Sequence, residues 1–277
     1  QMRFVQRNWF PKEFQNNGFR FHAPLGAGEN LLVLLHGLGD RPEPYLSFGQ
    51  KLDLPNTCCL ALQAPDPVLD IGYSWYPSFE ADGELIDPKA GDKRRIEGLE
   101  RTVRLVMEAI VSCWGRGGWL PDNTFVFGYS QGATVAVKLG LQLKIGGTIA
   151  VSGSLLEETL LGSKSNEEAT SNVKAGTPML LTHGMRDDRI PIELARKLKD
   201  KVSVLGKTEG WDCPIVWKEY DKGAEMLRLK PEVDHFMEFI APKLKSESQS
   251  LAKHPDIVEI KDPNMLNQVL HDNGFRT

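Results

Sequence analysis

A serine enclosed by two glycines is the residue of this sequence best suited to chemistry. The segment Gly128-Tyr129-Ser130-Gln131-Gly132 follows a strand-like apolar run and precedes a helix-like one. In such a strand–turn–helix the turn is so tight that side chains at the two glycine positions would collide, while the serine hydroxyl is exposed at the end of the strand. The pattern predicts a nucleophile for acyl transfer at Ser130. The alternative is a glycine-rich turn with an idle serine.

Two backbone amides are predicted to stabilise the oxyanion that such a nucleophile creates. His36-Gly37-Leu38-Gly39-Asp40 follows the strand-like run 31–35, which is the second place from which this type of site takes a donor. We expect the N–H groups of Leu38 and Gln131 to converge there, and losing one such donor typically lowers the rate by about 10²- to 10³-fold. His36 itself precedes the serine, whereas the expected order is serine, acid, histidine. A structural role is predicted for His36.

The acid of the site is expected in the segment that runs from His183 to Pro191. An aspartate on a loop after a late strand could orient a histidine base and stabilise its charged form. Asp187 is preferred to Asp188, which could instead cap the helix beginning at Pro191 or pair with a neighbouring arginine. His183 precedes the acid and so does not fit the expected order.

The elements that must position these residues follow a repeating pattern. Short apolar runs alternate with longer amphipathic ones, which predicts an α/β fold with a mostly parallel central sheet and helices on both faces. The predicted strands are Leu31–His36, Thr57–Ala64, Thr124–Tyr129, Gly147–Ser152, Met179–His183 and Ile215–Tyr220. The predicted helices are Glu43–Lys51, Lys93–Trp114, Gln131–Leu143, Pro191–Leu205 and Pro231–Leu244.

Other segments give weaker signals. Phe4–Phe10 and Phe19–Ala23 are predicted to add antiparallel strands at the sheet edge, and 256–261 could do the same. The stretch 65–92 is rich in Pro, Gly and Asp but carries several aromatic residues, so it is predicted to be an ordered functional loop.

Composition limits the class of protein. With 277 residues, 41% hydrophobic and 25% charged, the chain resembles an ordinary globular protein. We expect a single domain over residues 1–244 and a polar extension over 245–277. A net charge of -4 argues against nucleic acid or an anionic membrane as partner.

Targeting signals and cysteine spacing predict a cytoplasmic protein. The four cysteines lack the spacing of a disulfide framework or a zinc site. The first residues lack the apolar core of a signal peptide, and no apolar run reaches the roughly 20 residues that span a bilayer. Reduced thiols and no transmembrane segment are therefore expected.

From about residue 29 to residue 244, the chain resembles the phospholipase/carboxylesterase family of α/β-hydrolases, which includes the acyl-protein thioesterases. The resemblance rests on the segments 36–40, 128–133 and 184–191 and on the aromatic pair Trp75-Tyr76. It implies an α/β-hydrolase fold and the hydrolysis of acyl esters or thioesters through a Ser-His-Asp triad without a cofactor. It also places the catalytic aspartate at Asp187.

The chain departs from the family at the catalytic histidine. The family carries it in a Gly-His step after the last core strand, where this sequence has Gly223-Ala224. An introduced substitution in an active hydrolase is favoured, because Ser130 and Asp187 are retained. The alternative is a natural pseudoenzyme that binds lipids or acylated proteins. His235 fits the required order, but it is predicted to lie within a helix, several residues from the loop.

Substrate selection is assigned to an apolar groove. Leu69, Ile71, Trp75 and Tyr76 could line it, which favours acyl chains over charged alcohols or peptides. Some of these side chains could equally anchor the loop to the core. Lipidated proteins, lysophospholipids and short-chain esters are the substrates that the family implies, and the oligomeric state is left open.

Overall fold

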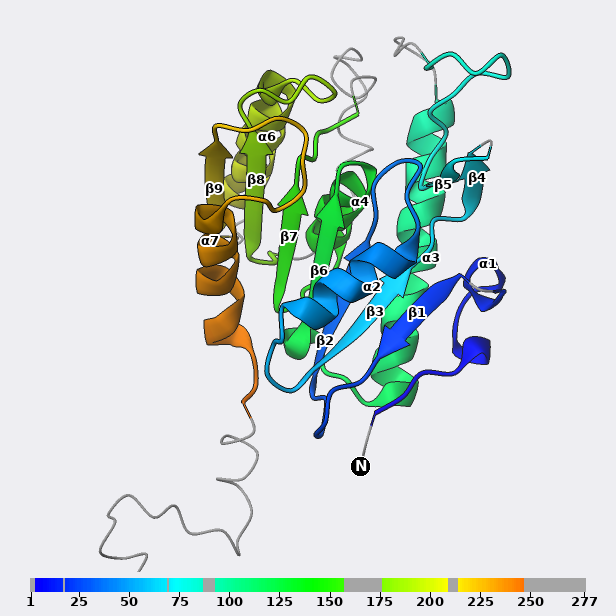
Figure 1. Cartoon of the computed structure of the whole chain (residues 1–277), viewed down its shortest axis with the longest axis vertical. Helices are drawn as coiled ribbons and strands as arrows, with labels where there is room; N and C mark the ends of the chain where they lie inside the picture. Colours follow the sequence, from blue (N-terminus) through cyan, green and yellow to red (C-terminus); the bar gives the residue numbers. More distant parts are fainter. Residues whose placement is uncertain are drawn as a thin grey trace, which may run out of the picture. The chain divides into compact units, whose positions relative to one another are not determined.

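A seven-stranded sheet forms the centre of the described part of the chain. The structure is a computed structural model and describes residues 3–16, 18–68, 70–86, 93–156, 176–208 and 214–246. The chain divides into two units, 1–244 and 245–277, and the first contains the sheet. Its strands lie in the order β1-β3-β2-β6-β7-β8-β9 (Figure 1). Their bounds are β1 Phe19–His22, β2 Asn30–Leu35, β3 Thr57–Leu62, β6 Thr124–Tyr129, β7 Gly147–Val151, β8 Met179–Gly184 and β9 Ile215–Tyr220.

Six of these strands run parallel to one another. The seventh, β1, is an edge strand and pairs antiparallel with β3. The mostly parallel sheet predicted from the sequence is confirmed. Because parallel strands end at the same edge of a sheet, the loops that follow β2, β6, β8 and β9 all leave from one edge. Leu35 pairs with Gly128 in the register of β2 and β6, so the segments predicted to supply the oxyanion donors start side by side.

Helices cover both faces of the sheet. Leu31, Val33 and Leu35 of β2 belong to a core cluster with α3 (Arg94–Gly117) and α4 (Gln131–Gln142). Leu32 and Leu34 belong to a second cluster with α2 (Pro42–Lys51) and α7 (Lys230–Ile240). A third cluster joins α4 to α6 (Ile192–Thr208). Since successive side chains of a strand point to opposite faces, the buried run of β2 requires a layer on each side.

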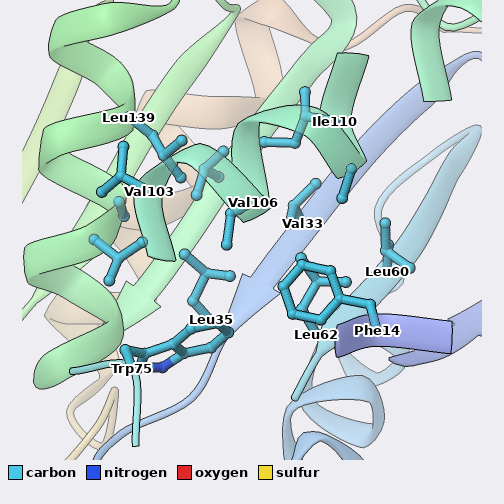
Figure 2. Close-up of a cluster of buried hydrophobic side chains, with 14 of the residues drawn as sticks. Phe14, Val33, Leu35, Leu60, Leu62, Trp75, Val103, Val106, Ile110 and Leu139 are labelled. Carbon is cyan, nitrogen blue, oxygen red and sulfur yellow. The ribbon is translucent and has the colours of Figure 1, made fainter. Parts of the chain in front are cut away.

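The largest core cluster forms between α3 and the sheet. Val103, Val106 and Ile110 recur at helical spacing and are fully buried against Val33 and Leu35 (Figure 2). This is the buried face that the periodicity of the segment predicts.

One predicted strand at the N-terminus is wrong. Residues 4–10 contain a 3-10 helix, Arg7–Trp9, followed by α1 (Lys12–Gln15). The backbone there bonds locally, from Trp9 N–H to Gln6 O at 3.0 Å and from Phe14 N–H to Pro11 O at 2.9 Å. Phe10 and Phe14 both enter the large core cluster, so this segment packs on the core without pairing with a strand. The edge strand predicted at Phe19–Ala23 is confirmed as β1.

The predicted loop 65–92 contains regular structure, and the last predicted helix is shorter than expected. The stretch 65–92 contains a small two-stranded sheet, β4 (Asp66–Val68) and β5 (Gly72–Ser74). The last helix ends at Ile240 and continues as a 3-10 turn, Ala241–Lys243, because Pro242 lacks the N–H that another α-helical turn needs. The predicted strand 256–261 lies outside the described residues. None of the described helices is both long and apolar enough to cross a membrane.

Candidate active site

Ser130 lies at the sharp turn between β6 and α4, with backbone angles φ 52° and ψ −117°. L-residues seldom adopt this conformation, and it costs about 1–3 kcal/mol where it occurs. A Cβ at Gly128 would lie 2.1 Å from the carbonyl oxygen of Gly132, and one at Gly132 would lie 2.4 Å from that of Leu35. Both positions therefore require glycine, for the steric reason inferred from the sequence.

The segment after β2 brings Leu38 to the same cavity as Ser130 and Gln131. The Gly37 N–H donates to Asp40 Oδ2 at 3.2 Å and to the Tyr45 hydroxyl at 3.1 Å, which fixes the turn. Among the described residues, the backbone N–H groups of Leu38 and Gln131 have no hydrogen-bond acceptor. Both amides are therefore available to an oxygen atom in the cavity.

His36 is fully buried beneath this turn. Its Nε2 accepts the Ala64 N–H at 3.0 Å, and its Nδ1 lies 2.7 Å from the Gly37 carbonyl oxygen. These two contacts require the proton on Nδ1. Burial lowers the pKa of His36 and so favours the neutral ring. The contacts agree with the structural role predicted for His36.

Asp187 is buried in the loop after β8. Its Oδ1 accepts the N–H groups of Arg189 at 3.0 Å and Ile190 at 2.9 Å, which fixes the carboxylate. Its buried Oδ2 has no hydrogen-bond partner among the described residues and lies 3.5 Å from Nε2 of His183. One carboxylate oxygen is thus held while the other remains able to accept a donor. Asp188, by contrast, is exposed, which favours Asp187 as the acid.

The loop after β9 carries Ala224 and contacts both the Ser130 turn and the loop of Asp187. The Ala224 carbonyl oxygen accepts a hydrogen bond from the hydroxyl of Tyr129, the neighbour of Ser130. On the other side, the Arg186 N–H donates to the Lys222 carbonyl at 2.9 Å. The loop that carries position 224 is therefore bonded both to the serine turn and to the aspartate loop.

The remaining described histidines do not replace that position. His235 lies on α7, where its Nδ1 is 2.8 Å from the Tyr220 hydroxyl, and it does not line the cavity at Ser130. His183 is fully buried, and its Nε2 lies 2.8 Å from the carbonyl oxygen of Ile190. His22 on β1 contacts Gln50. His254 and His271 lie outside the described residues.

A cavity of about 810 Å³ opens beside Ser130. Its apolar and aromatic lining residues are Leu38, Tyr76, Leu85, Ile86, Tyr129, Leu155, Ile190 and Leu194. Arg95, Arg189, Asp40 and Asp188 contribute charged groups to the wall. This combination of an apolar surface and a few polar groups suits a ligand with an acyl chain and a polar ester or thioester linkage.

Four residues are predicted to line an apolar groove, and of the three that the structure describes, one lines this cavity. Tyr76 lines it, whereas Ile71 is 57% exposed and does not. Trp75 is fully buried beside Leu35 in the large core cluster (Figure 2), and its indole N–H donates to the His36 carbonyl at 2.7 Å. Trp75 thus anchors the loop to the core, the alternative considered for these residues. Leu69 lies outside the described residues.

The side chain of Gln131 has a role that its sequence position did not reveal. Its Oε1 accepts the Trp75 N–H at 2.9 Å, and its Nε2 donates to the Tyr76 carbonyl at 3.1 Å and to the Ser78 hydroxyl at 2.6 Å. The residue after the serine therefore connects its helix to a segment of the cavity wall. The one sequence signal for such a bridge is the residue type, because a glutamine side chain can both donate and accept hydrogen bonds.

No group of three His, Cys, Asp or Glu residues in the described ranges has the arrangement of a metal site.

Comparison with known proteins identifies relatives of the chain. Residues 16–213 match the phospholipase/carboxylesterase family model, a range that contains Ser130 and Asp187 but ends before position 224. An uncharacterized hydrolase of Mycosarcoma maydis is 31% identical over 161 residues, which cover 54% of this chain and 58% of the relative. Acyl-protein thioesterase 1 of Saccharomyces cerevisiae is 25% identical over 252 residues, which cover 83% of this chain and 100% of the relative.

Solved structures share the fold. The esterase PE8 superposes with a TM-score of 0.63 at 24% identity, covering 79% of this chain and 94% of that one. Acyl-protein thioesterase 2 of Zea mays gives a TM-score of 0.58 at 20% identity, covering 82% and 99%. At these identities the likeness establishes the α/β-hydrolase fold, as the sequence predicts.

Proposed function

Because the chain belongs to the phospholipase/carboxylesterase family of hydrolases, we propose that its cavity binds acyl esters or thioesters for a Ser-His-Asp mechanism from which the histidine is missing. The observation that carries the proposal is the unpartnered Oδ2 of Asp187, in a loop bonded to the loop of Ala224. In a triad that carboxylate oxygen accepts the N–H of the base.

The remaining groups have defined roles in such a reaction. Ser130 Oγ attacks the carbonyl carbon, the leaving alcohol or thiol departs, and water then releases the acyl group. The N–H groups of Leu38 and Gln131 hold the negative oxygen of each tetrahedral intermediate. A histidine at position 224 would take the serine proton and return it to the leaving group.

Without that histidine, Ser130 remains a neutral hydroxyl and a poor nucleophile. Removing a triad base lowers turnover by about 10⁶-fold, on the order of 8 kcal/mol of barrier. Binding does not require the missing ring, because the cavity wall is built from other residues. The chain is therefore proposed to retain substrate binding and to have lost nearly all of its hydrolytic rate.

The test is the substitution Ala224→His, assayed on short p-nitrophenyl esters. We expect hydrolysis well above that of the unsubstituted chain, and we expect adding Ser130→Ala to the histidine variant to abolish it. A folded Ala224→His protein with an unchanged rate would refute the assignment of position 224.

A natural pseudoenzyme is the second candidate, and the alanine at position 224 is the observation that favours it. Such a protein would bind lipids or acylated proteins without hydrolysing them. The codon at position 224 in the parent gene separates the candidates, because a histidine codon there identifies the alanine as introduced. The cytoplasmic location expected from the sequence is part of either proposal.

Substrate preference within the family is a separate question. An acyl-protein thioesterase, a broad carboxylesterase and a lysophospholipase share the same triad and differ in the acyl and leaving groups that they accept. Comparing thioesters with oxygen esters of matched chain length in the Ala224→His variant distinguishes a thioesterase from a carboxylesterase. A lysophospholipid substrate tests the third activity.

A further inference from the structure

A second, smaller cavity lies next to the one that contains Ser130. It measures about 40 Å³ and lies among α3, α4, α6 and the segment that follows β7. Ser154 and Leu155 of that segment line both cavities. The two spaces are therefore neighbours that share one wall.

The walls of the small cavity are largely apolar and well packed. Leu99, Val137, Leu156 and Leu198 line it, and each is at most 4% exposed. The polar lining residues are already paired: Lys138 lies 2.7 Å from Glu100, and the Thr134 hydroxyl donates to the Ser154 carbonyl. The rest of the wall offers water few hydrogen bonds, so hydrocarbon is its favoured occupant. By the same measure of volume, one water needs about 10–15 Å³, and a methylene group is of similar size, so the cavity of about 40 Å³ has room for about three or four methylene groups.

A hydrogen bond ties the shared wall to α4. The Thr134 hydroxyl donates to the Ser154 carbonyl at 3.0 Å, which ties the segment to α4. Leu155 is half-buried and packs on the cluster between α4 and α6, with its surface divided between the two cavities. Leu155 is the larger of the two side chains that line both spaces.

We propose that the small cavity binds the distal end of the acyl chain of a substrate whose ester or thioester lies at Ser130, and that Leu155 at the junction sets the longest chain accepted. The inference rests on the proposed function and adds to it the direction of the acyl chain. That direction leads toward α3, α4 and α6.

The chain-length dependence of binding tests the proposal. In the unsubstituted protein, the dissociation constants of p-nitrophenyl esters from acetate to dodecanoate are measured by tryptophan fluorescence. Each buried methylene should tighten binding by about fourfold until the site is full, after which the constants reach a plateau. The acyl length at which the plateau begins is the readout.

Two substitutions should move that plateau in opposite directions. Ile96→Phe places a larger side chain at a half-buried position that lines only the small cavity, so the plateau should begin two or three carbons earlier. Leu155→Ala opens the junction, so the plateau should begin at a longer chain. Val111→Phe is the control, because Val111 is 45% exposed on the same helix and lines neither cavity.

The outcomes separate the inference from the proposed function. If the esters bind and Ala224→His hydrolyses them, but neither Ile96→Phe nor Leu155→Ala moves the plateau relative to Val111→Phe, the acyl-end site is wrong and the proposed function stands. If Ile96→Phe does not fold, Leu155→Ala decides alone. If no ester binds the protein and Ala224→His is inactive, both proposals are overturned.

Discussion

The backbone of Ser130 stores strain at the centre of the site. Its φ of 52° is a conformation that glycine adopts readily and serine does not. The glycines at 128 and 132 permit the sharp turn, but the strain at position 130 itself remains. Such strain is common where a reactive group must be held in one position, and it lowers the stability of the fold.

Replacing Ser130 by glycine should therefore stabilise the protein while removing the nucleophile. Ser130→Ala is the matched variant, because it also removes the hydroxyl but keeps a Cβ. Release of about 1–3 kcal/mol of strain, reduced by the greater freedom of glycine in the unfolded chain, should leave Ser130→Gly about 1 kcal/mol more stable than Ser130→Ala. Urea unfolding measures the difference, and equal midpoints with equal slopes would show that no strain is released.

At the scale of elements, a buried ion pair organises the loop between β9 and α7. Lys222 and Glu232 are nearly inaccessible, and Lys222 Nζ lies 2.5 Å from Glu232 Oε1. Nζ also donates to the Glu225 carbonyl at 2.6 Å, and Glu232 Oε2 accepts the N–H groups of Arg228 and Leu229 at 2.8 Å. The pair thus supports the loop around position 224, and none of these contacts involves an atom of Ala224.

Breaking this pair from one side should be costly. Lys222→Met leaves a buried carboxylate without its cation, which typically costs about 3–5 kcal/mol of unfolding free energy. We expect the double variant Lys222→Met/Glu232→Gln to cost less than the sum of the two single changes, which urea unfolding can measure as a double-mutant cycle.

The pair formed by Lys230 and Asp234 provides the control. Lys230 Nζ lies 2.7 Å from Asp234 Oδ2, and both residues belong to α7, the helix that carries Glu232. Their side chains, however, are 84% and 48% exposed. Surface pairs contribute at most about 1 kcal/mol, so Lys230→Met should have a small effect. Similar losses for Lys222→Met and Lys230→Met would show that burial does not strengthen the role of the inner pair.

At the scale of the whole molecule, the sheet and its two helical layers enclose the described thiols. Cys58 and Cys59 are adjacent on β3 and belong to the clusters on opposite faces of the sheet, while Cys113 of α3 belongs to the same cluster as Cys58. Burial raises the pKa of each thiol to about 12 from a usual value of 9.0. Since the thiolate is the reactive form, the fold should make all three thiols inert near neutral pH.

These thiols should react with a disulfide reagent at pH 8 only after the protein is unfolded. The raised pKa values also predict that the free energy of unfolding depends on pH. The buried thiols contribute fully to this free energy below pH 9, and their contribution is lost as the pH rises from 9 toward 12. The reason is that the unfolded chain then releases protons that the folded chain retains. Thiol titration with and without urea, and urea midpoints at pH 8 and pH 10, measure both effects. Rapid labelling of all three thiols in the folded protein would contradict the prediction.

Much of the fold follows from local patterns in the sequence. The parallel strands, the helices of both layers and the turn at Ser130 were predicted because each depends on residues within one short segment. The N-terminal segment 4–10 shows the limit of such patterns. Its aromatic residues suit a strand, but the position of Phe10 and Phe14 against the core selects a turn and a helix instead.

The sequence by itself determined which residues stand at the ends of which strands, and therefore that Ser130, Asp187 and Ala224 belong to one edge of the sheet. Only the tertiary structure decided what surrounds them. Trp75 became part of the core, Gln131 bonds α4 to the cavity wall, and Leu155 lines two neighbouring cavities. These roles depend on contacts between residues far apart in the chain, and no periodicity or motif within a single segment records such contacts.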